Sequence, residues 1–332
     1  MTRPHIALVC AGGTIDALGA SRLDLAWYTE TERRLPAGEI VAAVPELSQF
    51  AEIEQVPFDR RPSYAFAPSD WLTLARTVNE LLARSDVDGV VITHGTNTLE
   101  ETAYFLHLTT VPPKPVVLVG AMRPANGLGS EGQLNLLRAV QVAADPAARG
   151  LGALVAMNDT VHSARDVTKS HTFRPDTFRS PDAGPVGAAD ADGRVVFYHR
   201  PVRVPAEGAL FAVDRLTELP RVDVVLSYLG ADGILIDAAV AAGCKGLVSA
   251  GTGAGRPTAG EQAALDRALQ AGVVVCQASR VGSGRVPRSP KMAARGIVTA
   301  DNLQPWKARV LLLLALTKTF DTEAVQEMFD RL

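Results

Sequence analysis

Two segments of the chain combine glycine with threonine directly after an apolar run. The run Ile6 to Cys10 leads into Gly12-Gly13-Thr14, and the run Val87 to Thr93 leads into His94-Gly95-Thr96-Asn97-Thr98. A threonine hydroxyl acts as a nucleophile when a base accepts its proton and nearby donors stabilise the resulting oxyanion. The same residue types are favoured in tight turns and at helix N-caps. Taken alone, each segment is therefore more often a structural feature than a site.

A lysine is the candidate base. The polar segment Met157 to Lys169 follows the apolar run Ala153 to Met157, and we predict that it is a loop that presents Lys169. Most lysines are solvated surface charges, so position alone does not assign this role. Three histidines, at positions 94, 162 and 171, are scattered over predicted loops without convergent carboxylates. We therefore predict no metal site and no cofactor.

The elements that must position these residues alternate between strand and helix. Continuous apolar strands between helices predict an α/β fold with a parallel sheet covered on both faces, of the flavodoxin-like or Rossmann-like three-layer kind. In such a sheet, the loops around Thr14 and Thr96 project from the same edge, where ligands bind. The predicted strands are Ile6–Cys10, Val87–Thr93, Pro115–Val119 and Ala153–Met157, and the predicted helices are Trp71–Arg84, Leu99–Leu108 and Leu134–Ala144.

The pattern loosens between Asp176 and Leu219, where prolines and glycines interrupt short apolar pieces. We predict a hairpin there, followed by a linker. The predicted domains are an N-terminal catalytic α/β domain at 1–200, a linker at 201–220 and a smaller C-terminal α/β domain at 221–332. Capping-box spacing at Thr98-x-x-Glu101 and Thr258-x-x-Glu261, together with Pro305, marks three helix starts.

The composition is typical of a soluble enzyme. The 332 residues carry a net charge of −3, which gives no reason to expect nucleic acid or an anionic membrane as partner. No apolar run approaches the roughly 20 residues that span a bilayer, and the N-terminus shows no secretory signal. Three widely spaced cysteines suggest neither disulfides nor zinc. We expect a cytoplasmic protein whose partner is a small molecule.

Several motifs together resemble the bacterial-type L-asparaginase and glutaminase family. The resemblance covers essentially the whole chain, and the order of the motifs is specific. It implies an amidohydrolase that needs no metal and assembles as dimers of dimers, each site being completed by a neighbouring subunit. The motifs are Ala11–Ile15, His94–Ala103, Gly120–Pro124, Met157–Thr160, Arg165–Lys169 and Leu303–Arg309.

The resemblance implies a role for each candidate residue. Thr14 matches the nucleophile, Thr96 and Lys169 match two members of a second catalytic group, and Tyr28 matches the tyrosine that assists the nucleophile. Tyr28 belongs to Ser21 to Leu35, the lid segment, whose sequence looks little like the family's usual lid. The residues that match substrate-binding positions are Ser63, which stands eight positions before Trp71, and Gly13, Gly95, Asn97 and Ala121.

Three positions depart from the family pattern where the substrate ammonium group is bound. The usual motif His-Gly-Thr-Asp-Thr has Asn97 in place of aspartate. An asparagine expected in a Gly-x-Gly-x-Gly turn is Ala254, and an expected glutamate aligns with Arg285. An ammonium group beside an arginine is repelled by about 1 to 4 kcal/mol at 4 Å, depending on the effective dielectric. We therefore expect a substrate amide or imide without a free α-ammonium group, with Arg285 holding a carboxylate or carbonyl oxygen.

Two alternatives remain beside this hypothesis. One is an ordinary L-asparaginase, and the other is a catalytically inactive relative that only binds a small molecule. Loss of the aspartate also bears on Lys169, because a partly buried lysine without an adjacent anion is more easily neutral. Asp159 or Asp166 could supply a substitute charge. We expect backbone N–H groups of the Gly12–Thr14 loop and the Thr96 hydroxyl to hold the oxyanion.

Overall fold

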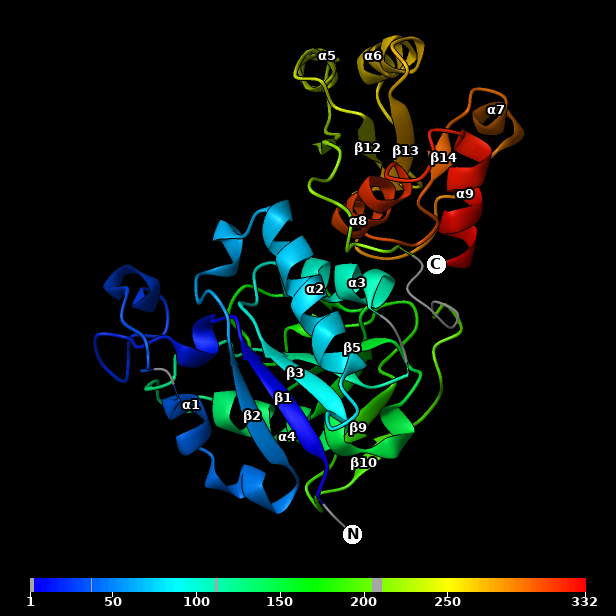
Figure 1. Ribbon diagram of the computed structural model, residues 1–332. Helices are drawn as coiled ribbons and strands as arrows, with labels where there is room; N and C mark the ends of the chain where they lie inside the picture. The colour runs from blue at the N-terminus through cyan, green and yellow to red at the C-terminus, as the bar shows by residue number, and fades with distance from the viewer. Residues whose placement is uncertain (1–2, 37, 111–112, 205–210) are drawn as a thin grey trace. The chain divides into compact units, whose positions relative to one another are not determined.

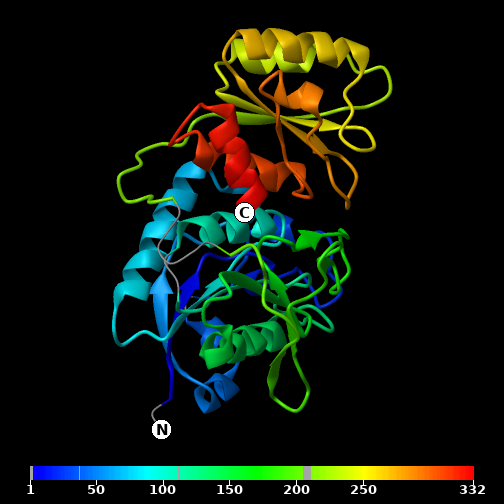
Figure 2. The ribbon, with the colours of Figure 1, turned by 90° about the vertical axis from the view of Figure 1, so that its right-hand side faces the viewer.

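The chain folds into two compact units, Met1–Arg215 and Leu216–Leu332. The structure is a computed structural model that describes residues 3–36, 38–110, 113–204 and 211–332. Figures 1 and 2 show both units from two directions. Residues 205–210 of the predicted linker lie outside the described residues. Along the described parts of the chain, no helix is long and apolar enough to cross a membrane.

The first unit is built on an eight-stranded sheet in the order β10-β9-β6-β5-β4-β3-β1-β2. The five strands from β2 to β5 are parallel, whereas β6, β9 and β10 run antiparallel to their neighbours. The parallel strands β1, β3, β4 and β5 are almost wholly buried, which explains their apolar sequences. The strands are β1 His5–Cys10, β2 Glu52–Pro57, β3 Gly89–Thr93, β4 Val116–Val119, β5 Ala153–Met157, β6 Thr160–Ser163, β9 Gly187–Ala189 and β10 Val195–Phe197.

Helices cover both faces of this sheet, as the sequence predicts. In Figures 1 and 2, α2 and α3 lie on one face and α4 on the other. The helix α3 is buried along nearly its whole length. The helices of this unit are α1 Glu39–Ala42, α2 Pro68–Ala83, α3 Leu99–Thr109 and α4 Gly132–Ala144.

The strand order places a topological switch point between β1 and β3. The chain leaves β1 toward β2 on one side and leaves β3 toward β4 on the other, so a crevice opens between their carboxyl ends. The two strands end level with each other, because Cys10 pairs with Thr93 in the parallel register. The loops that carry Thr14 and Thr96 therefore leave the sheet side by side.

The segment before Lys169 is a hairpin and not the predicted polar loop. Asn158 and Asp159 have φ angles of 52° and 59°, and Met157 pairs with Thr160 across them. Two successive residues with positive φ form the turn that joins tightly twisted antiparallel strands, and asparagine and aspartate tolerate this conformation. Lys169 itself lies on β7 Thr168–Lys169, which pairs with β8 Phe178–Arg179.

Two further details of the first unit differ from the sequence-based expectation. The strand β2 was not predicted, because it is an edge strand with largely exposed or half-buried residues. The helix α3 starts after Thr98, as the capping-box spacing predicts, but the Thr98 side chain makes no cap hydrogen bond. Its hydroxyl donates instead to the backbone oxygen of Ser63, at 3.0 Å.

The predicted hairpin is present as β9 and β10.

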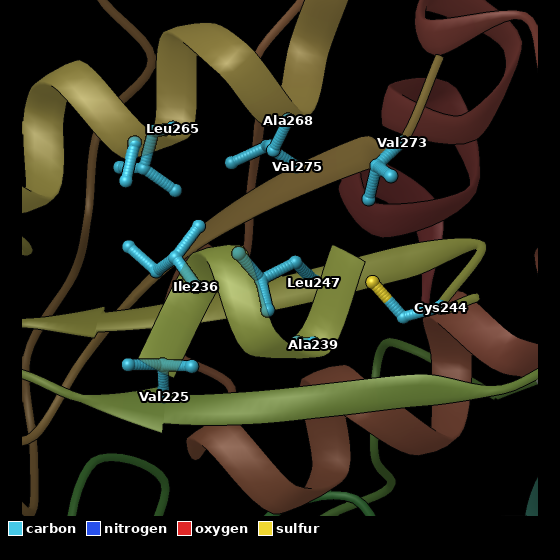
Figure 3. Close-up of a cluster of buried hydrophobic side chains, with 10 residues drawn as sticks. Val225, Ile236, Ala239, Cys244, Leu247, Leu265, Ala268, Val273 and Val275 are labelled. Atoms are coloured by element: carbon cyan, nitrogen blue, oxygen red, sulfur yellow. The ribbon is translucent and has the colours of Figure 1, made fainter. Parts of the chain in front are cut away.

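The second unit has a four-stranded parallel sheet in the order β11-β12-β13-β14. Figure 3 shows the apolar side chains, including Ile236, Leu247 and Leu265, that fill the space between this sheet and helices α5 and α6. Its strands are β11 Val222–Leu226, β12 Gly246–Gly251, β13 Val274–Ser279 and β14 Val298–Thr299. Its helices are α5 Ile234–Ala241, α6 Ala259–Gln270, α7 Pro290–Ala293, α8 Pro305–Ala315 and α9 Thr322–Arg331.

The helix signals in the second unit are mostly confirmed. Thr258 and Glu261 form the predicted capping box, and α8 begins at Pro305. The helix α9, which follows α8, was not predicted. Cys244 and Cys276 are buried, whereas Cys10 is half-buried at the end of β1, and all three are free thiols.

Candidate active site

A cavity of about 390 Å³ opens at the switch point between β1 and β3. It gathers residues from five parts of the first unit: the loop after β1, the lid segment, the loop before α2, the loop after β3 and the loop after β4. Lys169 and the residues that follow β7 complete its wall. The lining residues are Gly13, Thr14, Ala17, Leu25, Ala26, Tyr28, Thr29, Glu32, Arg33, Arg34, Pro62, Ser63, Tyr64, Gly95, Thr96, Asn97, Met122, Lys169, Thr172 and Phe173.

Thr14 begins a 3-10 turn, Thr14–Asp16, in the loop that follows β1. It is 8% exposed, and its Oγ1 lies 2.8 Å from the hydroxyl oxygen of Tyr28. Tyr28 begins a second 3-10 turn in the lid segment. Burial raises the pKa of Tyr28, and its hydrogen bond with Thr14 opposes this rise. The protonated phenol is therefore the resting form, and it can exchange a hydrogen bond with the threonine hydroxyl.

Lys169 makes a second pair with Thr96. Lys169 Nζ donates to Thr96 Oγ1 at 3.0 Å and reaches Asn97 Oδ1 at 3.4 Å. Burial lowers the pKa of the half-buried Lys169, because desolvation disfavours the ammonium form. The neutral amine, which can accept a proton from a hydroxyl, is thus populated at a lower pH than in an exposed lysine.

The acidic neighbour of Lys169 is Glu100, which the sequence analysis did not single out. Glu100 is buried in the first turn of α3, and its Oε1 accepts the backbone N–H of Lys169 at 3.1 Å. Its negative charge opposes the lowering of the Lys169 pKa. Both aspartates considered as substitutes have other partners: Asp159 pairs with Arg138 and Asp166 with Arg165, each at 2.9 Å. The sequence feature that could have identified Glu100 is its position in the first turn of the predicted helix, three residues after Asn97.

Glycines allow the loops of this site to touch. A Cβ at Gly13 would lie 2.6 Å from the backbone nitrogen of Gly95. A Cβ at Gly95 would lie 2.7 Å from Ser63 Oγ. No real Cβ makes contacts this short, so both positions exclude a side chain. Gly13 also has a φ of 108°, which only glycine adopts readily. The absence of side chains here brings Thr14, Thr96 and Ser63 around one cavity.

A buried hydrogen-bond chain holds the start of the Thr96 loop. His94 Nδ1 lies 2.8 Å from Gly95 O, which only accepts, so this nitrogen carries the proton. His94 Nε2 then accepts from the Thr102 hydroxyl at 3.1 Å, and Trp71 Nε1 donates to the same hydroxyl oxygen at 2.9 Å. Burial lowers the pKa of His94 to about 4. The histidine is therefore a neutral structural residue.

The other predicted site residues lie in different places. Ser63 is 2% exposed and accepts the Thr98 backbone N–H at 3.3 Å, which places it between the cavity wall and the Thr96 loop. Ala121 is fully buried, and its neighbour Met122 lines the cavity instead. Arg285 belongs to the second unit, where it forms an ion pair with Asp301 and keeps its side chain 70% exposed. The exposed turn residue Ala254 lies in that unit as well.

Nothing in the described ranges resembles a metal site, since no group of histidine, cysteine, aspartate and glutamate side chains has suitable positions. His162 is buried with Nδ1 2.9 Å from Ser180 Oγ. His171 is exposed, and its ring accepts backbone N–H groups of its own loop. These histidines do not converge with His94.

Comparison with known proteins agrees with this arrangement. Residues 5–203 match the family described as Asparaginase, N-terminal, and residues 221–329 match the Glutaminase/Asparaginase C-terminal domain. The L-asparaginase 2 of Bacillus subtilis (strain 168) is 40% identical over 327 residues, covering 98% of this chain and 86% of that protein. The L-asparaginase 2 of Escherichia coli (strain K12) is 39% identical over 330 residues, covering 99% and 93%.

A solved structure has the same fold throughout. The crystal structure of a probable cytoplasmic L-asparaginase from Campylobacter jejuni matches with a TM-score of 0.95 and 39% identity, covering 99% of this chain and 100% of that chain. The fold and the site thus define a hydrolase that acts on C–N bonds other than peptide bonds. The chain belongs to the asparaginase family.

Proposed function

We propose that the protein hydrolyses the side-chain amide of L-asparagine with Thr14 as the nucleophile. The observation that carries this proposal is the presence of two hydrogen-bonded pairs, Thr14 with Tyr28 and Lys169 with Thr96, on the wall of one cavity. The names of the relatives from Bacillus subtilis and Escherichia coli support L-asparagine as the substrate.

The reaction follows from the positions of these groups. Thr14 Oγ1 forms an ester bond to the amide carbon, and the C–N bond breaks. The hydroxyl proton leaves with the nitrogen as ammonia, by way of the basic groups of the site. Water then hydrolyses the ester and restores the hydroxyl. Backbone N–H groups of the Gly12–Thr14 loop and the Thr96 hydroxyl are the proposed oxyanion donors.

Replacement of the nucleophile tests this function. Thr14→Ala removes the only oxygen that forms the ester, so ammonia release from L-asparagine should fall at least 1,000-fold while circular dichroism stays unchanged. Thr29→Ala, on the lid segment, changes a cavity-lining threonine without touching the proposed nucleophile and should retain measurable turnover. Ammonia release by the Thr14 variant at the native rate would exclude Thr14. If the native protein binds amides but releases no ammonia from them, the inactive-relative alternative holds.

A second candidate substrate is favoured by the charges around the cavity. Asn97 offers a neutral amide oxygen where the family pattern has a carboxylate. Among the described residues that line the cavity, Glu32 alone carries a carboxylate, whereas Arg33 and Arg34 carry guanidinium groups. This balance favours a substrate amide or imide without a free α-ammonium group.

A pair of substrates separates the two candidates. L-asparagine and N-acetyl-L-asparagine share the reacting amide and differ in the α-ammonium charge. If the second candidate is right, kcat/KM is higher for the acetylated compound, and Asn97→Asp raises kcat/KM for L-asparagine alone. Efficient turnover of L-asparagine by the native protein, with micromolar KM, would reject the second candidate.

We also propose that the protein works in the cytoplasm, as described for the probable cytoplasmic L-asparaginase from Campylobacter jejuni. A relative from Haemophilus influenzae is named as a probable periplasmic L-asparaginase, which makes the periplasm the alternative location. Cell fractionation with an antibody against this chain distinguishes the two locations.

A further inference from the structure

A buried carboxylate joins three segments around the nucleophile. Asp16 stands two residues after Thr14, and 3% of its side chain is exposed. Its Oδ1 accepts from Arg34 Nη1 at 2.5 Å, and its Oδ2 lies 3.6 Å from Arg60 Nη1. Arg34 comes from the end of the lid segment, and Arg60 from the loop before Ser63. A carboxylate buried this deeply remains charged only beside such partners.

Backbone hydrogen bonds continue the same junction. The Leu35 N–H donates to Asp16 O at 2.8 Å, and the Leu18 N–H donates to Arg33 O at 2.9 Å. Arg60 Nη2 donates to Leu35 O at 2.9 Å. The end of the lid segment is thus paired with the residues that directly follow Thr14.

Arg34 also reaches the peptide group of the nucleophile. Its Nη1 donates to Gly13 O at 3.1 Å. In a trans peptide, the C=O and N–H groups point in opposite directions, so a cation that holds Gly13 O also fixes where the Thr14 N–H points. Gly13 has φ 108° and ψ −167°, a region open chiefly to glycine, so local preference does not hold this peptide in place. The hydrogen bond from Arg34 to Gly13 O therefore holds the Gly13–Thr14 peptide group in one orientation.

We propose that Asp16, Arg34 and Arg60 form a latch that orients the Thr14 peptide and holds Tyr28 of the lid segment against the nucleophile. The three are positioning residues, because they act through Thr14 and Tyr28 and not on the substrate. Tyr28 lies six residues before Arg34 on the same segment, so loss of the latch releases both ends of the Thr14–Tyr28 pair. This inference rests on the proposed function of Thr14.

A double-mutant cycle tests the latch. Arg34→Gln, Asp16→Asn and the double variant are compared by steady-state ammonia release, using L-asparagine or N-acetyl-L-asparagine, whichever the native protein turns over faster. We expect each single variant to lower kcat at least tenfold and to change KM less than threefold. The double variant should lose no more than the worse single variant, because the residues act as one unit.

The pair Asp88 and Arg149 provides the matched control. These residues form an exposed ion pair at 3.4 Å, with Asp88 just before β3. Asp88→Asn and Arg149→Gln make the same chemical changes and should keep kcat within twofold of the native value. Arg34→Lys retains the cation that Asp16 needs and is the variant to use if Arg34→Gln does not fold. The lysine is one atom shorter, so we expect a loss in kcat of at least threefold.

The outcomes separate this inference from the proposed function. A folded Arg34→Gln or Arg34→Lys protein with native kcat would overturn the latch. The latch would also be overturned if the fold-loss of kcat in the double variant equalled the product of the fold-losses in the two single variants. If Thr14→Ala is inactive at the same time, the proposed function stands without the latch. If Thr14→Ala remains active, the proposed function fails, and the latch as a device for positioning Thr14 fails with it.

Discussion

At the scale of single residues, the chemistry that we propose for the site depends on the charge state of Lys169. Lys169 Nζ lies within hydrogen-bond distance of Thr96 Oγ1, and burial lowers its pKa. Glu100 accepts the backbone N–H of the same lysine and favours its charged form. The two effects oppose each other, and burial dominates. Asn97 contributes an amide oxygen but no charge, so the negative charge that acts on Lys169 is that of Glu100.

The pH dependence of the reaction should report this balance. We propose that neutral Lys169 is the base, so kcat/KM should rise with pH through the pKa of Lys169, below its ordinary value of 10.5. Lys169→Arg keeps the charge at every accessible pH and should lower kcat by about 100- to 10,000-fold. Glu100→Gln removes the opposing carboxylate and should move the rising limb to lower pH. A pH profile that is identical in the native and Glu100→Gln proteins would contradict this account.

At the scale of elements, the junction of β3 with α3 is held by buried polar groups. The chain Trp71, Thr102, His94 and Gly95 O joins α2, α3 and the end of β3. The hydrogen bonds of this chain all run in one direction: Trp71 Nε1 donates to Thr102, the Thr102 hydroxyl donates to His94 Nε2, and His94 Nδ1 donates to Gly95 O. This direction fixes the tautomer of His94. The carbonyl of Gly95 is thereby fixed next to Thr96. The junction is a structural support for the loop that carries Thr96.

Stability should therefore depend on pH through His94. Its pKa is about 4 in the folded protein and 6.5 when unperturbed, so the unfolded chain binds more protons between these values. Lowering the pH from 7 to 5 should reduce the free energy of unfolding by about 2 kcal/mol through this residue alone. Urea unfolding of the native protein and of His94→Gln measures the difference. The exposed control His171→Gln should keep the native slope, and an equal slope in His94→Gln would refute the assignment.

At the scale of the whole molecule, each unit has its own sheet and its own apolar core. All residues that line the cavity belong to the first unit. Arg285 and Ala254, which the resemblance assigns to the binding of a substrate group, lie in the second. In the family pattern these positions serve the site of a neighbouring subunit. We therefore propose a homo-oligomer, a dimer or a tetramer, with shared sites.

Light scattering after size-exclusion chromatography tests the assembly. We expect the mass of two or four chains, and specific activity that falls on dilution below the dissociation constant, because a monomer lacks the second unit of its neighbour. Arg285→Ala should change KM for the substrate more than kcat, whereas Arg256→Ala, in the nearby turn, should change neither. A monomeric protein of full activity would refute shared sites.

Much of the architecture was predictable because the apolar runs in the sequence are the segments that the fold buries. Apolar runs such as Val87 to Thr93 are buried from both sides, so hydrophobicity alone marks them as strands of a covered sheet. The edge strand β2 and the hairpin before Lys169 escaped prediction, since their residues are exposed or polar. The helix start at Thr98 was predicted correctly, but its side-chain cap was not, because the hydroxyl donates to Ser63 O, a tertiary partner that no local pattern shows.

The sequence by itself determined the α/β class, the two threonine loops and the unusual Asn97. These features depend on residue type, order and spacing along the chain. Only the tertiary structure decided which groups meet: Glu100 beneath Lys169, Arg34 on the Gly13 carbonyl, and Met122 in the place expected for Ala121. Side-chain contacts between distant segments depend on strand order and on loop packing at glycines such as Gly13 and Gly95. That geometry is a property of the folded chain as a whole.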